Sequence, residues 1–158
     1  MEQDTHHTTP ALGRQPVTVR PISPEETYAL RHAVLWPDKP ISYVQLPEDL
    51  HGQHFGAFTN SDNESNPELV SIISLFVDDS GEARFRKFAT APKWQGIGIG
   101  SVLLKYTIEA AVELGATRIW CDARETALGF YQRFGMSGEG AVFFKSEVPY
   151  LRMSKPLP

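Results

Sequence analysis

The sequence of 158 residues has one cysteine, no long apolar segment and no concentration of basic residues. The single Cys121 excludes an intrachain disulfide and fits a reducing, cytoplasmic compartment. No apolar run approaches the roughly 20 residues that cross a bilayer, and residues 1–15 lack the pattern of an export or transit signal. The 15 lysines and arginines are scattered in a chain of net charge −4, so we expect neither a nucleic-acid nor a membrane partner.

What remains is the composition of a soluble globular protein, with 41% hydrophobic and 22% charged residues. Residues 1–15 are polar and without periodicity, which predicts a disordered tail. Residues 16–158 are enough for a single domain with an ordinary core. The oligomeric state is left open between a monomer and a homodimer. The pair His6–His7 is too short to indicate a metal site, and we expect no metal.

The first half of the chain predicts a strand, a helical stretch and a meander of three strands. Val17–Arg20 alternates as a short strand does. Ser23, Pro24 and Glu26 are a capping serine, a proline at the first helical position and a glutamate three residues after the serine. They predict a helix to about Leu35. A short second helix is expected within residues 41–50. The meander strands are expected at His54–Phe58, Leu69–Val77 and Ala83–Ala89.

The second half alternates helices and strands. Apolar residues recur at helical spacing between Gly98 and Leu114, and Gly115 follows as a C-terminal cap, which predicts a long packed helix. Further elements are expected as a strand at Arg118–Cys121, a helix over residues 126–134, and strands over residues 141–144 and 150–153. The pattern predicts a mixed sheet with helices, in the α+β or α/β class.

Three glycines, Gly96, Gly98 and Gly100, stand at alternate positions where a strand turns into the long helix. Glycines let a ligand approach the backbone closely, and the N–H groups at the start of a helix favour an anion such as a phosphate. A Walker A loop is excluded because neither Lys-Ser nor Lys-Thr follows the last glycine.

A dinucleotide fingerprint is an alternative, with Asp122 at the distance of a ribose-binding acid. It lacks its third glycine, because Ser101 stands there. Only 36 residues follow Asp122, too few for a doubly wound sheet.

The order Gln95-x-x-Gly98-x-Gly100 fits the acetyl-CoA loop Q/R-x-x-G-x-G/A. With this loop and the expected order of elements, the chain resembles the GNAT superfamily of N-acetyltransferases. The resemblance implies an α+β (three-layer α/β) fold, with a mixed, mostly antiparallel sheet of about seven strands and about four helices.

More narrowly, the chain is similar to the glyphosate N-acetyltransferase type of small-molecule enzyme. The segments that carry this similarity are residues 26–32, 54–58, 86–90, 120–124 and 131–135.

The resemblance implies acetyl-CoA as the cosubstrate. The backbone of Phe88, Ala89 and Thr90 is then expected to hold the pantetheine and the thioester, with the Phe88 N–H donating to the thioester carbonyl. The residues whose amides are expected to hold the pyrophosphate are Gln95, Gly96, Ile97, Gly98, Ile99, Gly100 and Ser101.

Two tyrosines are the expected catalytic side chains. The family resemblance places Tyr131 near the sulfur as a proton donor to the thiolate, although an aromatic that only packs its helix onto the sheet gives the same pattern. Tyr150 stands where related enzymes carry a histidine base. A phenol is a poor base near pH 7, so Tyr150 either positions the amine, or water takes the proton, or the optimum lies at higher pH. His32 and His54 are the alternative bases.

The acceptor is expected to be the primary amine of a small molecule. The resemblance implies that Arg86 and Arg124 hold the acidic end of the substrate, while Trp36 replaces a third arginine. We therefore expect an amine with one acidic group, such as an amino acid. The alternatives are a peptide or protein N-acetyltransferase and an acetyl-CoA-binding module without turnover.

Overall fold

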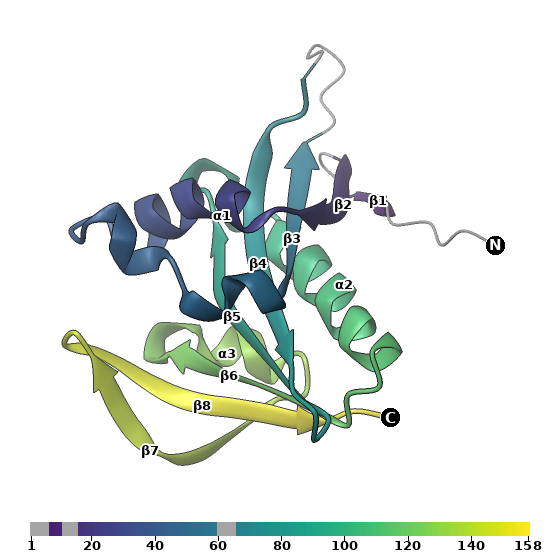
Figure 1. The fold of residues 1–158 in the computed structure, drawn as a ribbon, viewed down its shortest axis with the longest axis vertical. Helices are drawn as coiled ribbons and strands as arrows, with labels where there is room; N and C mark the ends of the chain where they lie inside the picture. Colours follow the sequence, from purple (N-terminus) through teal and green to yellow (C-terminus); the bar gives the residue numbers. More distant parts are fainter. Residues whose placement is uncertain (1–6, 11–15, 60–65) are drawn as a thin grey trace.

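In the computed structural model, residues 7–10, 16–59 and 66–158 are described. Within these ranges, eight strands form one sheet in the order β1-β2-β3-β4-β5-β6-β8-β7 (Figure 1). The strands are β1 (His7–Pro10), β2 (Pro16–Ile22), β3 (Gln53–Thr59), β4 (Leu69–Val77), β5 (Glu82–Thr90), β6 (Arg118–Arg124), β7 (Ser137–Lys145) and β8 (Val148–Pro156). All neighbours are antiparallel except β5 and β6, which confirms the predicted mixed, mostly antiparallel sheet.

The α-helices of the described chain are α1 (Pro24–Leu30), α2 (Ile99–Glu113) and α3 (Leu128–Gln132). Ser23 and Glu26 form the predicted capping box at the start of α1. A π-helical turn, η1 (Arg31–Leu35), extends α1 to the predicted end. The second helix expected within residues 41–50 is instead two 3₁₀ turns, η2 (Ile41–Val44) and η3 (Pro47–His51). The strand β1 falls within the segment expected to be a disordered tail.

Helices and turns cover both faces of the central strands. Phe55 of β3 packs edge-on against Tyr106 of α2, with ring centroids 5.1 Å apart. The neighbouring His54 points to the opposite face, as strand alternation requires, and its Nε2 lies 2.9 Å from the Asp49 carbonyl oxygen of η3. On the α2 side, Leu103 and Leu104 are fully buried. Burial of a leucine contributes about 1.5–3 kcal/mol each, so α2 is held to the sheet mainly by apolar contact.

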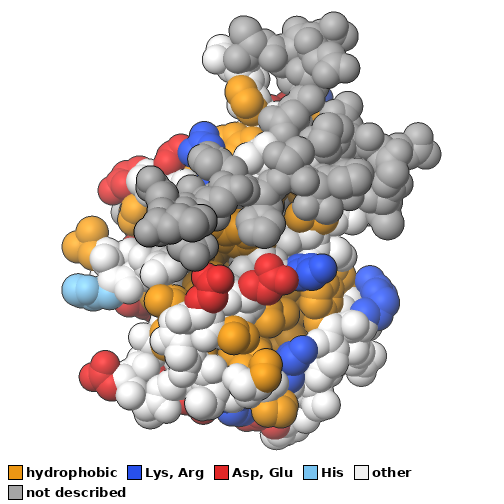
Figure 2. All heavy atoms as spheres, turned by 90° about the vertical axis from the view of Figure 1, so that its right-hand side faces the viewer, with side chains coloured by type: hydrophobic (Ala, Val, Ile, Leu, Met, Phe, Trp, Pro, Cys, Tyr) orange, Lys and Arg blue, Asp and Glu red, His pale blue; other side chains and the backbone are white. Residues whose placement is uncertain are grey.

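The side of the molecule that carries α2 is seen in Figure 2, where hydrophobic side chains lie between charged ones. Among the described residues, no helix combines the length and the apolar character that a membrane span needs.

Two irregularities of β5 shape the middle of the sheet. Its parallel pairing with β6 extends only from Glu82 to Arg84, opposite Arg118 to Trp120. Toward β4, the register shifts between Ser74 and Ile72, which pair with Arg86 and Ala89 respectively. Lys87 and Phe88 therefore form a β-bulge, and Lys87 has a φ of 55°. The bulge and the parting of β5 from β6 create the space in which the candidate site lies.

Candidate active site

A groove of about 490 Å³ lies between β5, the start of α2 and α3. Gly96 and Gly98 have φ values of 79° and 93°, so both positions require the left-handed conformation that glycine adopts readily. Gly98 caps α2 without any side-chain hydrogen bond to the helix N–H groups. The first N–H groups of α2 therefore remain available to a ligand, at the positive end of a helix of 15 residues. This arrangement suits a phosphate group.

Most residues expected to hold acetyl-CoA lie around this groove. The lining includes Phe88, Ala89, Thr90, Gln95, Gly96, Gly98, Gly100 and Ser101. The Gln95 side chain donates to the Thr90 carbonyl oxygen at 2.8 Å and so links the loop to β5. Ile99 is instead 1% exposed and belongs to the core, and Ile97 packs against the core. These two isoleucines can therefore offer a ligand only their backbone.

A second, smaller cavity of about 170 Å³ adjoins the groove. It contains all the residues expected to bind the acceptor, namely Trp36, Arg86 and Arg124, together with both expected catalytic tyrosines, Tyr131 and Tyr150. Phe88, Ala127 and Tyr131 line both spaces. The two spaces therefore meet at Tyr131, where a group carried in the groove would reach a molecule held in the cavity.

Tyr131 lies in an apolar aromatic cluster. Its ring centroid is 5.7 Å from that of Phe85, 6.5 Å from Phe88 and 5.2 Å from Phe130. Burial raises the pKa of Tyr131 well above its usual value, with a smaller effect from Cys121. The phenol is therefore protonated at neutral pH and is a hydrogen-bond donor rather than a base.

Arg124 connects the other expected residues on the β6 side of the cavity. Its Nε donates to the Tyr150 hydroxyl at 3.2 Å, and its Nη2 donates to the Leu35 carbonyl oxygen at 2.6 Å. The guanidinium carbon lies 5.1 Å from the centroid of the Trp36 ring. These contacts fix the guanidinium plane, and none of them is to an acid. The positive charge of Arg124 thus has no acidic partner among the described residues.

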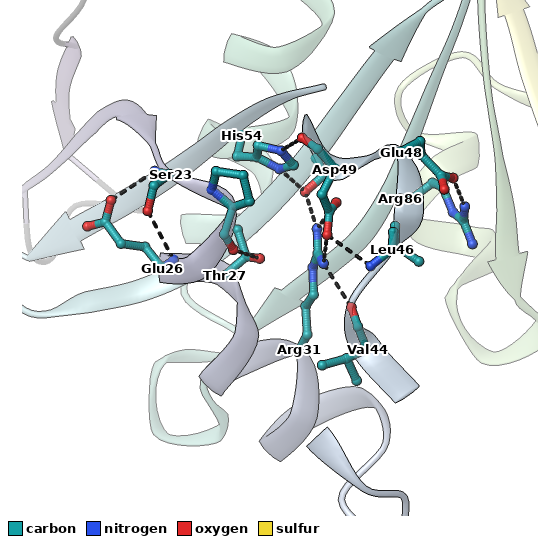
Figure 3. Close-up of polar contacts among 12 residues, drawn as sticks. Ser23, Glu26, Thr27, Arg31, Val44, Leu46, Glu48, Asp49, His54 and Arg86 are labelled. Carbon is teal, nitrogen blue, oxygen red and sulfur yellow. Dashed lines mark hydrogen bonds and ion pairs between the residues drawn. The ribbon is translucent and has the colours of Figure 1, made fainter. Parts of the chain in front are cut away.

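Arg86 differs, because it forms an ion pair with Glu48 of η3 (Figure 3). The next residue, Asp49, receives two hydrogen bonds from the fully buried Arg31, at 2.8 and 2.9 Å. Burial alone would raise the pKa of Asp49, but hydrogen bonds from Arg31 and from the Leu46 N–H outweigh it and hold the pKa below its usual value. The buried pair anchors η3 and so places Glu48 over Arg86.

The two histidines considered as bases lie outside both spaces. Nδ1 of His54 is 2.7 Å from the Ser74 hydroxyl, and its Nε2 contacts the Asp49 carbonyl oxygen, within the buried network of Figure 3. His32 Nε2 lies 2.6 Å from the Lys39 carbonyl oxygen. Neither residue lines the groove or the cavity. Both are therefore held in structural contacts.

Sequence reasoning missed three cations of the cavity, Arg84, Lys87 and Lys145. Asp122 of β6 pairs with Arg84 at 3.0 Å, with Lys145 at 3.4 Å and with Arg152, which is not in the cavity lining, at 3.1 Å. The carboxylate of Asp122, which the dinucleotide alternative assigned to a ribose, is therefore surrounded by three cations. Lys87 was missed because nothing in the sequence indicates a β-bulge, and it is the bulge that places this strand residue in the lining of the cavity.

Comparison with known proteins gives this architecture a family. The sequence profile of the Acetyltransferase (GNAT) family matches residues 22–136. The chain is also 30% identical over 134 residues to the uncharacterized N-acetyltransferase YitI of Bacillus subtilis (strain 168), which spans 79% of this chain and 85% of that protein. The chain therefore belongs to the GNAT family, and it is an acetyl-CoA-dependent N-acetyltransferase.

Solved structures of several acetyltransferases share the fold. A GNAT family acetyltransferase from Elizabethkingia anophelis with acetyl-CoA bound has a TM-score of 0.66 at 18% identity, covering 89% of this chain and 98% of the other. An IAA acetyltransferase from Bacillus cereus ATCC 14579 has a TM-score of 0.67 at 19% identity, covering 89% and 99%. An aminoglycoside 6'-N-acetyltransferase complexed with coenzyme A has a TM-score of 0.68 at 14% identity, covering 89% and 97%. The identities are low, so these structures support the fold alone.

Proposed function

We propose that this chain acetylates the primary amine of a small molecule that carries one acidic group, such as an amino acid. The observation that carries the proposal is the small cationic cavity that meets the cosubstrate groove at Tyr131. A cavity of about 170 Å³ suits a small molecule better than a folded protein surface. The resemblance to the glyphosate N-acetyltransferase type supports the same class of acceptor.

The charges around the cavity favour an anionic acceptor. Arg84 and Lys145 share the carboxylate of Asp122, and Arg86 is paired with Glu48. Two further lining cations, Arg124 and Lys87, have no acidic partner among the described residues. A guanidinium accepts a carboxylate in a planar two-point contact, so the acid group is assigned to Arg124. The Trp36 ring beside it offers a flat apolar wall.

On the cosubstrate side, the residues fit acetyl-CoA. The free N–H groups at the start of α2 and the open glycine loop suit its pyrophosphate. The bulge removes Phe88 from the β4 ladder, so the Phe88 N–H is assigned to the thioester carbonyl. Acetyl-CoA supplies the activated acetyl group, which the acceptor nitrogen attacks directly. Tyr131, kept protonated by its apolar surroundings, donates its proton toward the departing sulfur.

The test is a thiol-release screen with acetyl-CoA over amino acids, aminophosphonates, amino sugars and arylamines. We expect turnover with amines that carry one acid group, and a KM for them that rises at least about tenfold in Arg124→Gln, since a charge-assisted contact contributes about 1.5–3 kcal/mol. Arg118→Gln is the matched control, because this arginine lies at the other end of β6 and pairs with Glu82 and Glu139.

Other outcomes separate the alternatives. Efficient use of a doubly acidic phosphonate contradicts the assignment of a single acid group. Acetylation of peptides in preference to free amino acids identifies a protein or peptide acetyltransferase. Saturable acetyl-CoA binding without turnover of any amine identifies a binding module, and both results overturn the proposal.

A further inference from the structure

Lys87 occupies a backbone position that is costly for a lysine. Its φ of 55° lies in the left-handed region, within the bulge of β5. A side chain in that region costs roughly 1–2 kcal/mol, which glycine avoids. Backbone strain of this kind concentrates at functional positions, where the side chain is needed in one particular place. The strained backbone carries the Lys87 side chain into the lining of the acceptor cavity.

The Lys87 amine has no hydrogen bond and no ion pair within the described part of the chain. It is surrounded mainly by like charges. Arg86 flanks it on β5, and Arg124 of β6 and Lys145 of β7 line the same cavity. Arg31 of η1 adds a further positive charge. Unlike Arg86 and Lys145, Lys87 thus has no carboxylate beside it.

The remaining titratable side chains that face the cavity are engaged or protonated. Asp122 is paired with three cations, and Glu48 of η3 is paired with Arg86. Burial raises the pKa of Cys121, so its thiol keeps its proton, as does the Tyr131 phenol. The Tyr150 hydroxyl accepts a hydrogen bond from Arg124. None of these groups offers a free basic lone pair to an incoming ammonium.

We propose that the amine of Lys87 is the general base that accepts a proton from the ammonium group of the acceptor. The proposal rests on the proposed function, because it requires an amine in this cavity. Burial, followed by the charges of Arg86, Arg31, Lys145 and Arg124, lowers the pKa of Lys87 from 10.5 to about 8. A substantial fraction of Lys87 is therefore neutral near pH 8, which is the state a base needs.

The protons and bonds balance in this scheme. The acceptor ammonium gives its first proton to Lys87, which later releases it to solvent. The neutral nitrogen forms a C–N bond to the acetyl carbon as the C–S bond breaks. The nitrogen then loses its second proton to solvent, while Tyr131 gives its proton to the sulfur and regains one from solvent, so one proton is released overall. An acid group on Arg124 offsets part of the positive charge around Lys87 and raises its pKa once the substrate is bound, which favours the first transfer.

The experiment compares pH–rate profiles of the wild-type protein with Lys87→Met and Lys87→Arg. Arginine keeps the positive charge but is not a base, so it separates proton transfer from anion binding. For a base, we expect kcat at pH 7.5 to fall about 10²–10⁴-fold in both variants. The KM for acetyl-CoA stays within about twofold, and the wild-type rise of kcat/KM through pH 8 is lost. Near wild-type kcat in Lys87→Arg overturns the proposal, because it identifies Lys87 as an anion-binding residue.

Two further measurements keep the test decisive. Lys87→Gly fits the backbone conformation without strain, so its loss of kcat is not explained by failure to fold.

Amine labelling of the wild-type protein, followed by mass spectrometry across pH 6–11, is expected to show Lys87 reacting with a midpoint near 8. Lys105, exposed on α2, serves as the control lysine. A midpoint for Lys87 equal to that of Lys105 overturns the base role even if no acceptor is found, whereas absence of turnover alone refutes the proposed function.

Discussion

Replacing Lys87 by glycine is expected to stabilise the protein while it removes activity. The wild-type backbone at Lys87 has a φ of 55°, and the half-buried amine lies among arginines without a carboxylate partner. Both features cost free energy in the folded state. Glycine removes both costs. If the strain at Lys87 is retained for function, the Lys87→Gly protein should be more stable and less active than the wild type.

The magnitude follows from three contributions. Relief of the left-handed conformation contributes about 1–2 kcal/mol, and roughly 0.5–1 kcal/mol of that is lost again because glycine is more flexible in the unfolded chain. Lowering a pKa from 10.5 to about 8 corresponds to at most ~3.4 kcal/mol, which solvent screening at a half-buried amine reduces to about 1 kcal/mol. The net gain is about 1–2 kcal/mol, or a rise in Tm of roughly 2–8 °C for a protein of this size.

The gain depends on pH in a definite direction. The pKa of Lys87 is lower in the folded than in the unfolded protein, so the unfolded chain binds more protons between about pH 8 and 10.5. Wild-type stability therefore rises with pH across this window as the charge penalty disappears. The advantage of Lys87→Gly is expected to be largest below pH 8 and to shrink toward the backbone contribution above 10.5.

Thermal unfolding by circular dichroism at several pH values measures both effects. Glu147→Gly is the matched control, since Glu147 has a φ of 69° in the exposed turn between β7 and β8, outside the cavity. This control should gain the backbone contribution without the pH dependence of a buried amine. A lower Tm for Lys87→Gly than for the wild type, or a gain identical at pH 7 and pH 10.5, would refute the reasoning.

Three further substitutions test other parts of the site. Tyr131→Phe should lower kcat at least about tenfold with little change in the KM for acetyl-CoA, and unchanged turnover removes Tyr131 from the mechanism. Arg31→Met leaves the Asp49 carboxylate buried without its partner and should lower the free energy of unfolding by about 3–5 kcal/mol in urea titrations; a loss under 1 kcal/mol contradicts this. Glu48→Gln releases Arg86 and should lower the KM for acidic acceptors several-fold but not for neutral amines, and equal changes for both count against a substrate contact by Arg86.

Much of the fold was accessible to local sequence patterns. The serine, proline and glutamate at the start of α1 predicted its capping box, and the spacing of apolar residues predicted α2. Such signals work because they depend on neighbours a few residues apart. Residues 41–50 were expected to hold one short helix but form two 3₁₀ turns, because Pro40 caps the first turn and Pro47 begins the second.

The site was accessible only in part, because its polar partners are distant in sequence. The resemblance brought Trp36, Arg86 and Arg124 together, and the structure lines one cavity with them. The pairing of Arg86 with Glu48 joins residues 38 positions apart and has no local signature. Lys87 was missed for a different reason. Its backbone is left-handed, and residues other than glycine rarely adopt that conformation, so local sequence preference predicts a regular strand here.

The short parallel pairing between β5 and β6 also affects how parts of the molecule unfold locally. The antiparallel strands β2 to β5 and the unit β6-β8-β7 each have their own hydrogen-bonded ladder, and only three residue pairs join the two ladders. Hydrogen exchange is therefore expected to report two units of different protection. The groove proposed to hold acetyl-CoA is lined from both sides of this joint, by β5 and by α3. Acetyl-CoA at a hundred times its Kd would add about 2.7 kcal/mol of stability, much of it as resistance to the separation of these two units.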